Sequence, residues 1–143
     1  MEYKWKNNVI FSERNDLSKF LLDYYQSNPQ RKIIYLLGEG FDPRMTNGLR
    51  YFLPKVKSGQ IDCLLIDFPS TKTPPYQELI DDNMKELLGL YSKYEVTEHS
   101  EVSVDFSTNF DLALRLLDQK LAKYNLGKYT DIIIDISAIP RFA

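Results

Sequence analysis

Short runs of apolar residues recur along the chain and predict buried strands. The clearest runs cover residues 32–37 (KIIYLL), 61–68 (IDCLLIDF) and 130–136 (TDIIIDI). Continuous apolar runs of this length are typical of strands that are covered on both faces in a parallel sheet. Two weaker segments, residues 8–12 (NVIFS) and part of 95–105 (EVTEHSEVSVD), predict edge or irregular strands.

Between these runs the apolar residues recur at helical spacing, which predicts helices. The expected helices cover residues 16–27, 42–53, 76–94 and 109–124. We expect the second helix to open at Asp42 and Pro43, because Asp is a good N-cap and Pro fits the first helical position. Gly48 lies inside this helix and Pro54 is expected to end it, so the helix should be imperfect.

Strand and helix alternate four times, which predicts βαβ units with right-handed crossovers. We therefore expect an α/β, Rossmann-like three-layer fold with a mainly parallel sheet of about four to five strands and helices on both faces. A chain of 143 residues predicts one domain, 1–143. Because no covering helix follows the last loop (SAIPRFA), we expect either that the natural protein continues or that a partner chain or further domain covers this loop.

Composition narrows the classes of partner. The net charge is −2, from 18 Lys and Arg against 20 Asp and Glu, so a nucleic-acid partner, which needs a basic face, is unsupported. The single cysteine, Cys63, lies in an apolar run and is expected to be buried as a small hydrophobe. No apolar run is long enough to span a bilayer, so a cytoplasmic protein without a membrane partner is expected.

The ends of two strands predict a site. If the strands are ordered 3-2-1-4, the strand at 33–37 neighbours the strand at 132–136 across the point where the strand order reverses. Ligands of open parallel sheets bind beyond the carboxyl ends of the strands at such a point. The turn GEGFDPR (38–44) and the loop DISAIPR (135–141) should then face each other over one crevice.

The glycine turn suits a polar, anionic or nucleotide-like ligand. Gly38 and Gly40 permit close backbone approach, and Arg44 and Arg141 could clamp a carboxylate or phosphate. The same turn also fits a purely structural interpretation, in which the glycines make a tight turn and Arg44 forms a surface ion pair of little energetic weight.

Acids and a serine at the strand ends complete the predicted site. Asp67 lies where Rossmann-like folds often hold ribose hydroxyls, and Asp135 and Ser137 would line the opposite wall. Glu39 or Asp42 could act as an acid, base or nucleophile, since carboxylates at a dry strand end can have raised pKa values. The alternative is that Asp42 is only an N-cap and the other acids only solvate loops.

Two other kinds of site are not expected. His99, the only histidine, lies in an acidic segment with Glu98 and Glu101, but a metal site there would need ligands from elsewhere in the chain. We predict no metal at this position. A Ser-His-Asp arrangement is also unsupported, because the chain has no G-x-S-x-G motif.

Two motifs resemble a known family. IIYLLGEGFDPR and, one strand later, LLIDFPSTK resemble the first and second motifs of S-adenosylmethionine-dependent methyltransferases, particularly the carboxyl-methyltransferase-like branch. The resemblance implies that Gly38, Gly40, Asp42 and Arg44 lie around the methionine portion of S-adenosylmethionine, and that Asp67 takes the ribose hydroxyls. It also implies a fragment or reduced module, because the chain ends soon after the fourth unit.

Three functions follow as hypotheses. The first is a Rossmann-like domain that binds a nucleotide or nucleotide-derived ligand, such as S-adenosylmethionine, at the carboxyl ends of its strands. The second is a nucleotide or nucleoside hydrolase or transferase that uses Glu39 or Asp42. The third is a non-catalytic sensor or adaptor module of a larger assembly. The fold cannot choose among them, because the same sheet hosts many unrelated functions.

Overall fold

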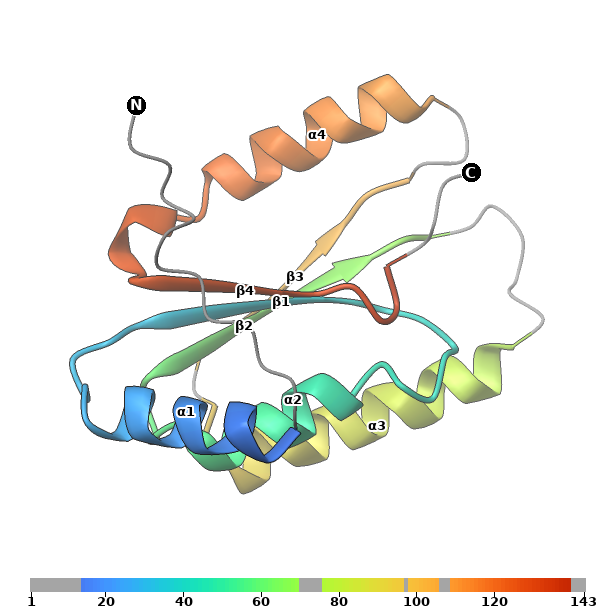
Figure 1. The fold of residues 1–143 in the computed structure, drawn as a ribbon. Coiled ribbons are helices and arrows are strands. Elements are labelled where there is room, and N and C mark those ends of the chain that lie inside the picture. The colour runs from blue at the N-terminus through green and yellow to red at the C-terminus, as the bar shows by residue number, and fades with distance from the viewer. Residues whose placement is uncertain (1–13, 70–75, 97, 106–108, 140–143) are drawn as a thin grey trace.

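A four-stranded parallel sheet is the centre of the molecule (Figure 1). The computed structural model describes residues 14–69, 76–96, 98–105 and 109–139. Within these ranges the strand order is β3-β2-β1-β4, which confirms the order predicted around the switch point. The strands are β1 (Ile33–Gly38), β2 (Ile61–Asp67), β3 (His99–Ser103) and β4 (Asp131–Asp135). The strand expected at 8–12 lies outside the described residues.

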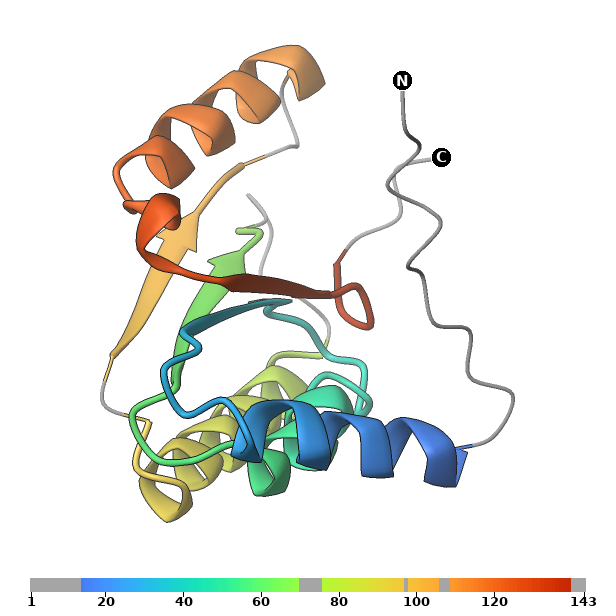
Figure 2. The same ribbon diagram turned by 60° about the vertical axis from the view of Figure 1, so that its left-hand side comes forward.

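Helices cover both faces of the sheet, so the predicted three-layer α/β architecture is confirmed. Figures 1 and 2 show α1, α2 and α3 on one face and α4 on the other. The helices are α1 (Arg14–Gln26), α2 (Asn47–Phe52), α3 (Gln77–Lys93) and α4 (Phe110–Ala122), and two short 3₁₀ turns are η2 (Leu53–Lys55) and η3 (Leu126–Lys128).

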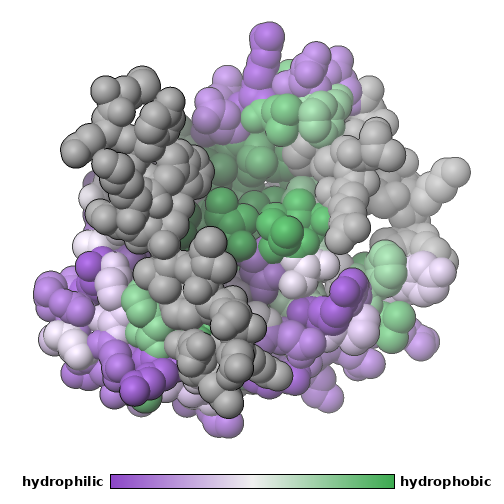
Figure 3. Space-filling model, viewed as in Figure 1, coloured by the Kyte–Doolittle hydropathy of each residue, from purple (hydrophilic) through white to green (hydrophobic). Residues whose placement is uncertain are grey.

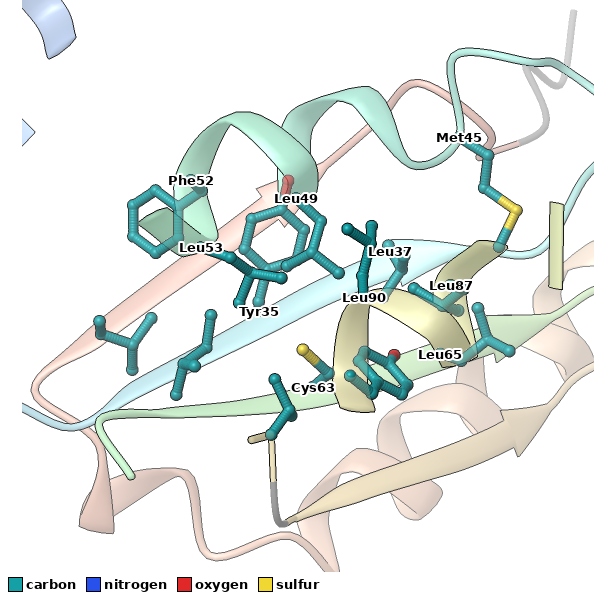
Figure 4. Packing of buried hydrophobic residues seen from close by; sticks show 14 of the residues in the cluster. Tyr35, Leu37, Met45, Leu49, Phe52, Leu53, Cys63, Leu65, Leu87 and Leu90 are labelled. Atoms are coloured by element: carbon teal, nitrogen blue, oxygen red, sulfur yellow. The ribbon is translucent and has the colours of Figure 1, made fainter. Parts of the chain in front are cut away.

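The larger core fills the space between the sheet and the helices α1, α2 and α3, and Figure 4 shows part of it. Alternate residues of β1 and β2, among them Tyr35 and Leu37, point into this core and meet Leu49 of α2 and Leu87 of α3. The other residues of these strands, such as Ile34 and Leu36, pack under α4. Both faces of β1 are therefore buried, as its continuous apolar run predicted.

Strand β4 departs from the prediction. Its apolar run predicted a buried strand, but Ile132, Ile134 and Ile136 are 52%, 59% and 74% exposed. The physical reason is the placement of α4, whose buried Ala113 packs with Val102 and Val104 at the opposite edge of the sheet. Figure 3 shows the apolar surface that is left in the hollow below α4. A run of isoleucines encodes a strand, but coverage depends on which strands the helix lies over.

The helix after the glycine turn also begins later than predicted. Residues 42–46 form turns in which the Met45 N–H donates to the Asp42 carbonyl at 3.0 Å, and α2 begins only at Asn47. The Asp42 side chain accepts the Arg44 N–H at 2.8 Å, so it stabilises a turn in place of capping the helix. The expectation of a helix opening at Asp42 and Pro43 is therefore wrong.

Candidate functional site

The turn after β1 and the loop after β4 meet at the carboxyl edge of the sheet, as predicted. A Cβ atom added to Gly38 would lie 3.0 Å from the carbonyl of Ala138, and one added to Gly40 would lie 3.2 Å from the Ala138 Cβ atom. The two loops are thus in direct contact, and the glycines admit the Ala138 backbone. Protein atoms fill the space between the two loops, so a ligand would have to bind at the outer rim of this edge of the sheet.

Hydrogen bonds to the Asp135 side chain connect the end of β4 to β1 and to the loop that follows β4. The Tyr35 hydroxyl donates to one oxygen of Asp135 at 2.8 Å, and the Ser137 N–H donates to the other at 2.9 Å. Asp135 Oδ2 and the Tyr35 hydroxyl oxygen lie against α2, since a Cβ atom on Gly48 would be 2.2 Å from the first and 2.6 Å from the second. Gly48 therefore allows α2 to pass over this hydrogen bond. Arg141 lies outside the described residues.

Asp42 and Arg44 bind each other. The Arg44 guanidinium donates through Nε and Nη2 to the Asp42 carboxylate at 2.9 and 2.5 Å. These hydrogen bonds, with that of the Arg44 N–H, lower the pKa of Asp42 to about 2. Asp42 is therefore ionised near neutral pH, which suits the role of a turn-stabilising acceptor better than that of a proton donor.

Three carboxylates gather near the carboxyl ends of β1 and β2: Glu39 follows β1, Asp67 ends β2, and Glu101 lies in the middle of the neighbouring β3. Each of Glu39, Asp67 and Glu101 offers one oxygen, and these oxygens all lie within 4.8 Å of one another. The strand register explains the meeting, because Gly38 pairs with Ile66 and Leu65 pairs with Glu101. We call Glu39, Asp67 and Glu101 the carboxylate cluster.

Glu39 is the member of the carboxylate cluster with a strongly shifted pKa. Burial raises its pKa, and the negative charges of Asp67 and Glu101, a hydrogen bond to Asp67 and the charge of Asp81 raise it further, to about 7. A carboxyl group with this pKa can give or take a proton near neutral pH. Glu39 thus has the acid–base character that the sequence assigned to it as one of two candidates.

The carboxylate cluster offers only oxygen ligands. Such a set can hold a hard divalent cation such as Mg²⁺ or Ca²⁺, or accept hydrogen bonds from hydroxyl or ammonium groups. The sequence reasoning predicted no metal site and assigned Glu101 no role there. Only the pairing of β2 with β3 brings Glu101 to Asp67. The ring of His99, at which no metal was predicted, stacks on Tyr91 with centroids 4.8 Å apart.

A buried amide from α3 holds the glycine turn. The Asn83 side chain is 7% exposed and donates to the Gly40 carbonyl at 2.7 Å and to the Asp42 carbonyl at 3.0 Å. Sequence reasoning missed this residue. The signal available was an Asn on the apolar side of an amphipathic helix, since a buried amide needs hydrogen-bond partners.

Room for a ligand exists at the same edge of the sheet. A cavity of about 310 Å³ lies between the end of β3 and the start of α4. Pro69, which follows β2, and Ser103, which ends β3, are among the residues that line it. None of the three members of the carboxylate cluster lines this cavity, which lies on the α4 face of the sheet with Ala113 and Leu116.

Two remaining expectations concern Cys63 and the membrane. Cys63 is a free, buried thiol, and burial raises its pKa to about 12, so it is an inert part of the core as predicted. Among the described helices, none combines the length and the apolar character needed to cross a membrane.

Comparison with known proteins adds no assignment. No protein-family model matches the sequence, and no curated protein matches it either. The likeness to methyltransferases therefore stays a prediction from two motifs.

Proposed function

We propose that this domain binds a nucleotide or nucleotide-derived ligand over the carboxyl ends of β1, β2 and β3, with S-adenosylmethionine as the first candidate. The observation that carries the proposal is the meeting of three carboxylates from separate strands at the edge where open parallel sheets bind ligands. Asp67 ends β2, the place where Rossmann-like folds hold ribose hydroxyls.

The negative charge of the carboxylate cluster favours some candidate ligands over others. A bare triphosphate would be repelled by the carboxylate cluster, whereas a sulfonium group is attracted to it and a Mg²⁺ ion could bridge phosphates to it. Hydroxyl groups of a ribose can donate to carboxylate oxygens whatever the rest of the ligand carries. S-adenosylmethionine and Mg²⁺-bound nucleotides are therefore favoured over free nucleotides.

The proposal is tested by following thermal unfolding with S-adenosylmethionine, NAD and ATP, the last with and without Mg²⁺. A ligand at 100 times its dissociation constant stabilises the folded state by about 2.7 kcal/mol. Asp67→Asn and Glu101→Gln should reduce the shift, whereas Asp118→Asn on the exposed side of α4 should not. A folded sample that shifts with none of the probes would overturn the proposal.

The enzymatic alternative is favoured by one observation, the pKa of about 7 at Glu39. In that case the domain is a nucleotide or nucleoside hydrolase or transferase, with Glu39 as the proton donor or acceptor. Product formation from nucleosides and nucleotides, followed by liquid chromatography, should be lost in Glu39→Gln while the fold is kept. Asp42→Asn should matter less, because Arg44 already holds Asp42 ionised. Unchanged turnover in Glu39→Gln would exclude this alternative.

The adaptor alternative is favoured by the exposed isoleucines of β4. Exposed apolar surface of this kind marks interaction sites in many proteins, and a partner chain or further domain over β4 would cover it. Size-exclusion chromatography with light scattering separates the cases. A stable, ligand-free monomer would count against an obligate partner.

A further inference from the structure

Two aromatic rings lie exposed beside the proposed site. Phe41 lies in the glycine turn, and Tyr76 lies at the start of α3. The centroids of the two rings are 4.8 Å apart, and the ring planes are inclined by 36°. Phe41 is 52% exposed and Tyr76 is 50% exposed. Each ring covers part of the other, and each still presents about half of its surface to solvent.

The position of Phe41 is held from both sides. Asn83 donates to the carbonyls of Gly40 and Asp42, the residues immediately before and after Phe41. Asn83 belongs to α3, the helix that Tyr76 precedes. One helix therefore fixes the backbone on both sides of Phe41 and also carries the second ring. A ligand that stacks here meets a preorganised surface, which lowers the entropic cost of binding.

The loop and the helix that carry the two rings also carry acidic groups. Phe41 is two residues beyond Glu39 in the same loop, and the negative charge of Asp81, in the second turn of α3, helps to raise the pKa of Glu39. The loop after β1 and the first turns of α3 therefore contribute both aromatic and acidic groups. A planar ring of the ligand can stack on the aromatic pair while its hydroxyl or cationic groups face the carboxylates.

We propose that Phe41 and Tyr76 form a stacking platform for the planar base of the ligand. This inference rests on the proposed function and specifies its ligand as a nucleoside-type molecule that is held by its base as well as by its ribose. It places the base at the glycine turn, where the methyltransferase resemblance would place the methionine portion of S-adenosylmethionine. Stacking is tolerant of base identity, because every base has a π-face. The platform therefore contributes to affinity, whereas discrimination between bases depends on other contacts.

The test compares S-adenosylmethionine and adenosine, which carry a base, with ribose 5-phosphate and methionine, which do not. Binding is measured by calorimetry for the wild type, Phe41→Leu, Tyr76→Leu and the double variant. Leu keeps an apolar side chain but removes the π-face. The matched control is Phe20→Leu, which alters a half-exposed ring stacked on Tyr24 in α1.

Each platform variant should bind the adenosine-containing probes about tenfold more weakly, the equivalent of about 1.4 kcal/mol, and Phe20→Leu should bind as the wild type does. Saturation-transfer NMR should show the adenine protons of the bound probe receiving magnetisation from aromatic protons, and this transfer should fall in the double variant.

Two results would overturn the platform, and they are distinguishable. Wild-type affinity for S-adenosylmethionine and adenosine in both single variants and in the double variant would remove the platform and leave the proposed function standing. Absence of binding of every probe to the folded wild type would remove both. Thermal unfolding of each variant without ligand confirms that the fold is kept.

Discussion

The carboxylate cluster at the carboxyl end of the sheet and the acids at the amino end are in opposite electrostatic states. At the amino end, Asp131 pairs with Arg31 at 3.1 Å, and Lys128 pairs with Glu98 at 3.0 Å and with Asp62 at 3.6 Å. The hydrogen bond from Lys128 is the largest cause of the lowered pKa of Glu98. Acids at this end are stabilised as anions by cations on neighbouring segments.

At the carboxyl end the acids face one another. The carboxylate cluster raises the pKa of Glu39 to about 7, and no ion pair found in the described part of the chain involves its three members. Cavities do not distinguish the two ends, because one of about 200 Å³ lines the amino end as well. The charge states of the acids do distinguish the two ends.

The difference separates structural acids from candidate functional acids. A paired acid contributes to folding, whereas a group of mutually repelling acids destabilises the folded state and is retained only where something else uses it. Loss of a paired acid at the amino end should therefore lower stability, whereas loss of an acid of the carboxylate cluster should raise it.

The largest effect is expected for Asp131→Ala at the amino end. The Arg31 side chain is mostly buried and its guanidinium lies 4.0 Å over the Tyr24 ring. Its Nε atom has no hydrogen-bond partner among the residues that the structure describes. Loss of Asp131 leaves this charge without its anion and should lower the free energy of unfolding by about 3 kcal/mol in urea titrations. Asp118→Ala on exposed α4 is the control, and an equal loss in both variants would contradict the comparison.

Asn83→Ala should have the next largest effect, at the carboxyl end. Two carbonyls of the glycine turn lose a donor that is itself buried, which should lower the free energy of unfolding by about 2 kcal/mol. Hydrogen exchange should rise in residues 39–45 more than in β1. Gln119→Ala, an exposed amide on α4, should leave both unchanged. Unaltered exchange in the turn would show that Asn83 does not hold it.

Glu39→Gln should stabilise the protein, and the gain should depend on pH. The folded-state pKa of Glu39 is about 7 against an ordinary value of 4.5, so the folded state keeps a proton that the unfolded chain loses between these values. The stability of the wild type therefore falls as pH rises through this window. The variant should gain about 1 kcal/mol at pH 8, after allowance for partial exposure, and nothing at pH 4.

The control for this prediction is Glu78→Gln, an exposed acid in the first turn of α3. Unfolding curves at pH 4, 6 and 8 separate the two variants. A Glu39→Gln variant that is less stable than the wild type at pH 8 would mean that the carboxylate cluster does not repel Glu39.

The smallest effect is expected for Lys128→Met at the amino end. The pKa of Glu98 should rise toward its ordinary value, because Lys128 supplies the hydrogen bond and the positive charge that lower it. The measurement is an NMR titration of the Glu98 carboxyl group, repeated at high salt. Exposed ion pairs contribute little to stability, so the unfolding midpoint should stay within error. An unchanged titration of Glu98 would contradict the pairing.

Local pattern predicted most of the fold. The apolar runs of β1 and β2 and the helical spacing in α1, α3 and α4 are properties of neighbouring residues, and these elements lie where they were expected. The strand order agrees with the 3-2-1-4 arrangement that we assumed from the sequence for a Rossmann-like sheet. The start of α2 was misjudged because the Asp42 side chain binds Arg44 in place of capping the helix.

The sequence by itself determined the alternating strands and helices of a parallel sheet, because periodicity and chain order are sufficient for that. The meeting of the glycine turn with the loop after β4 followed only once the 3-2-1-4 strand order was assumed. Only the tertiary structure decided what these loops do. Register brought Glu101 to Asp67, α4 left the isoleucines of β4 exposed, and α3 supplied Asn83 to the turn. Each of these depends on contacts between segments far apart in the chain, whose geometry no local pattern encodes.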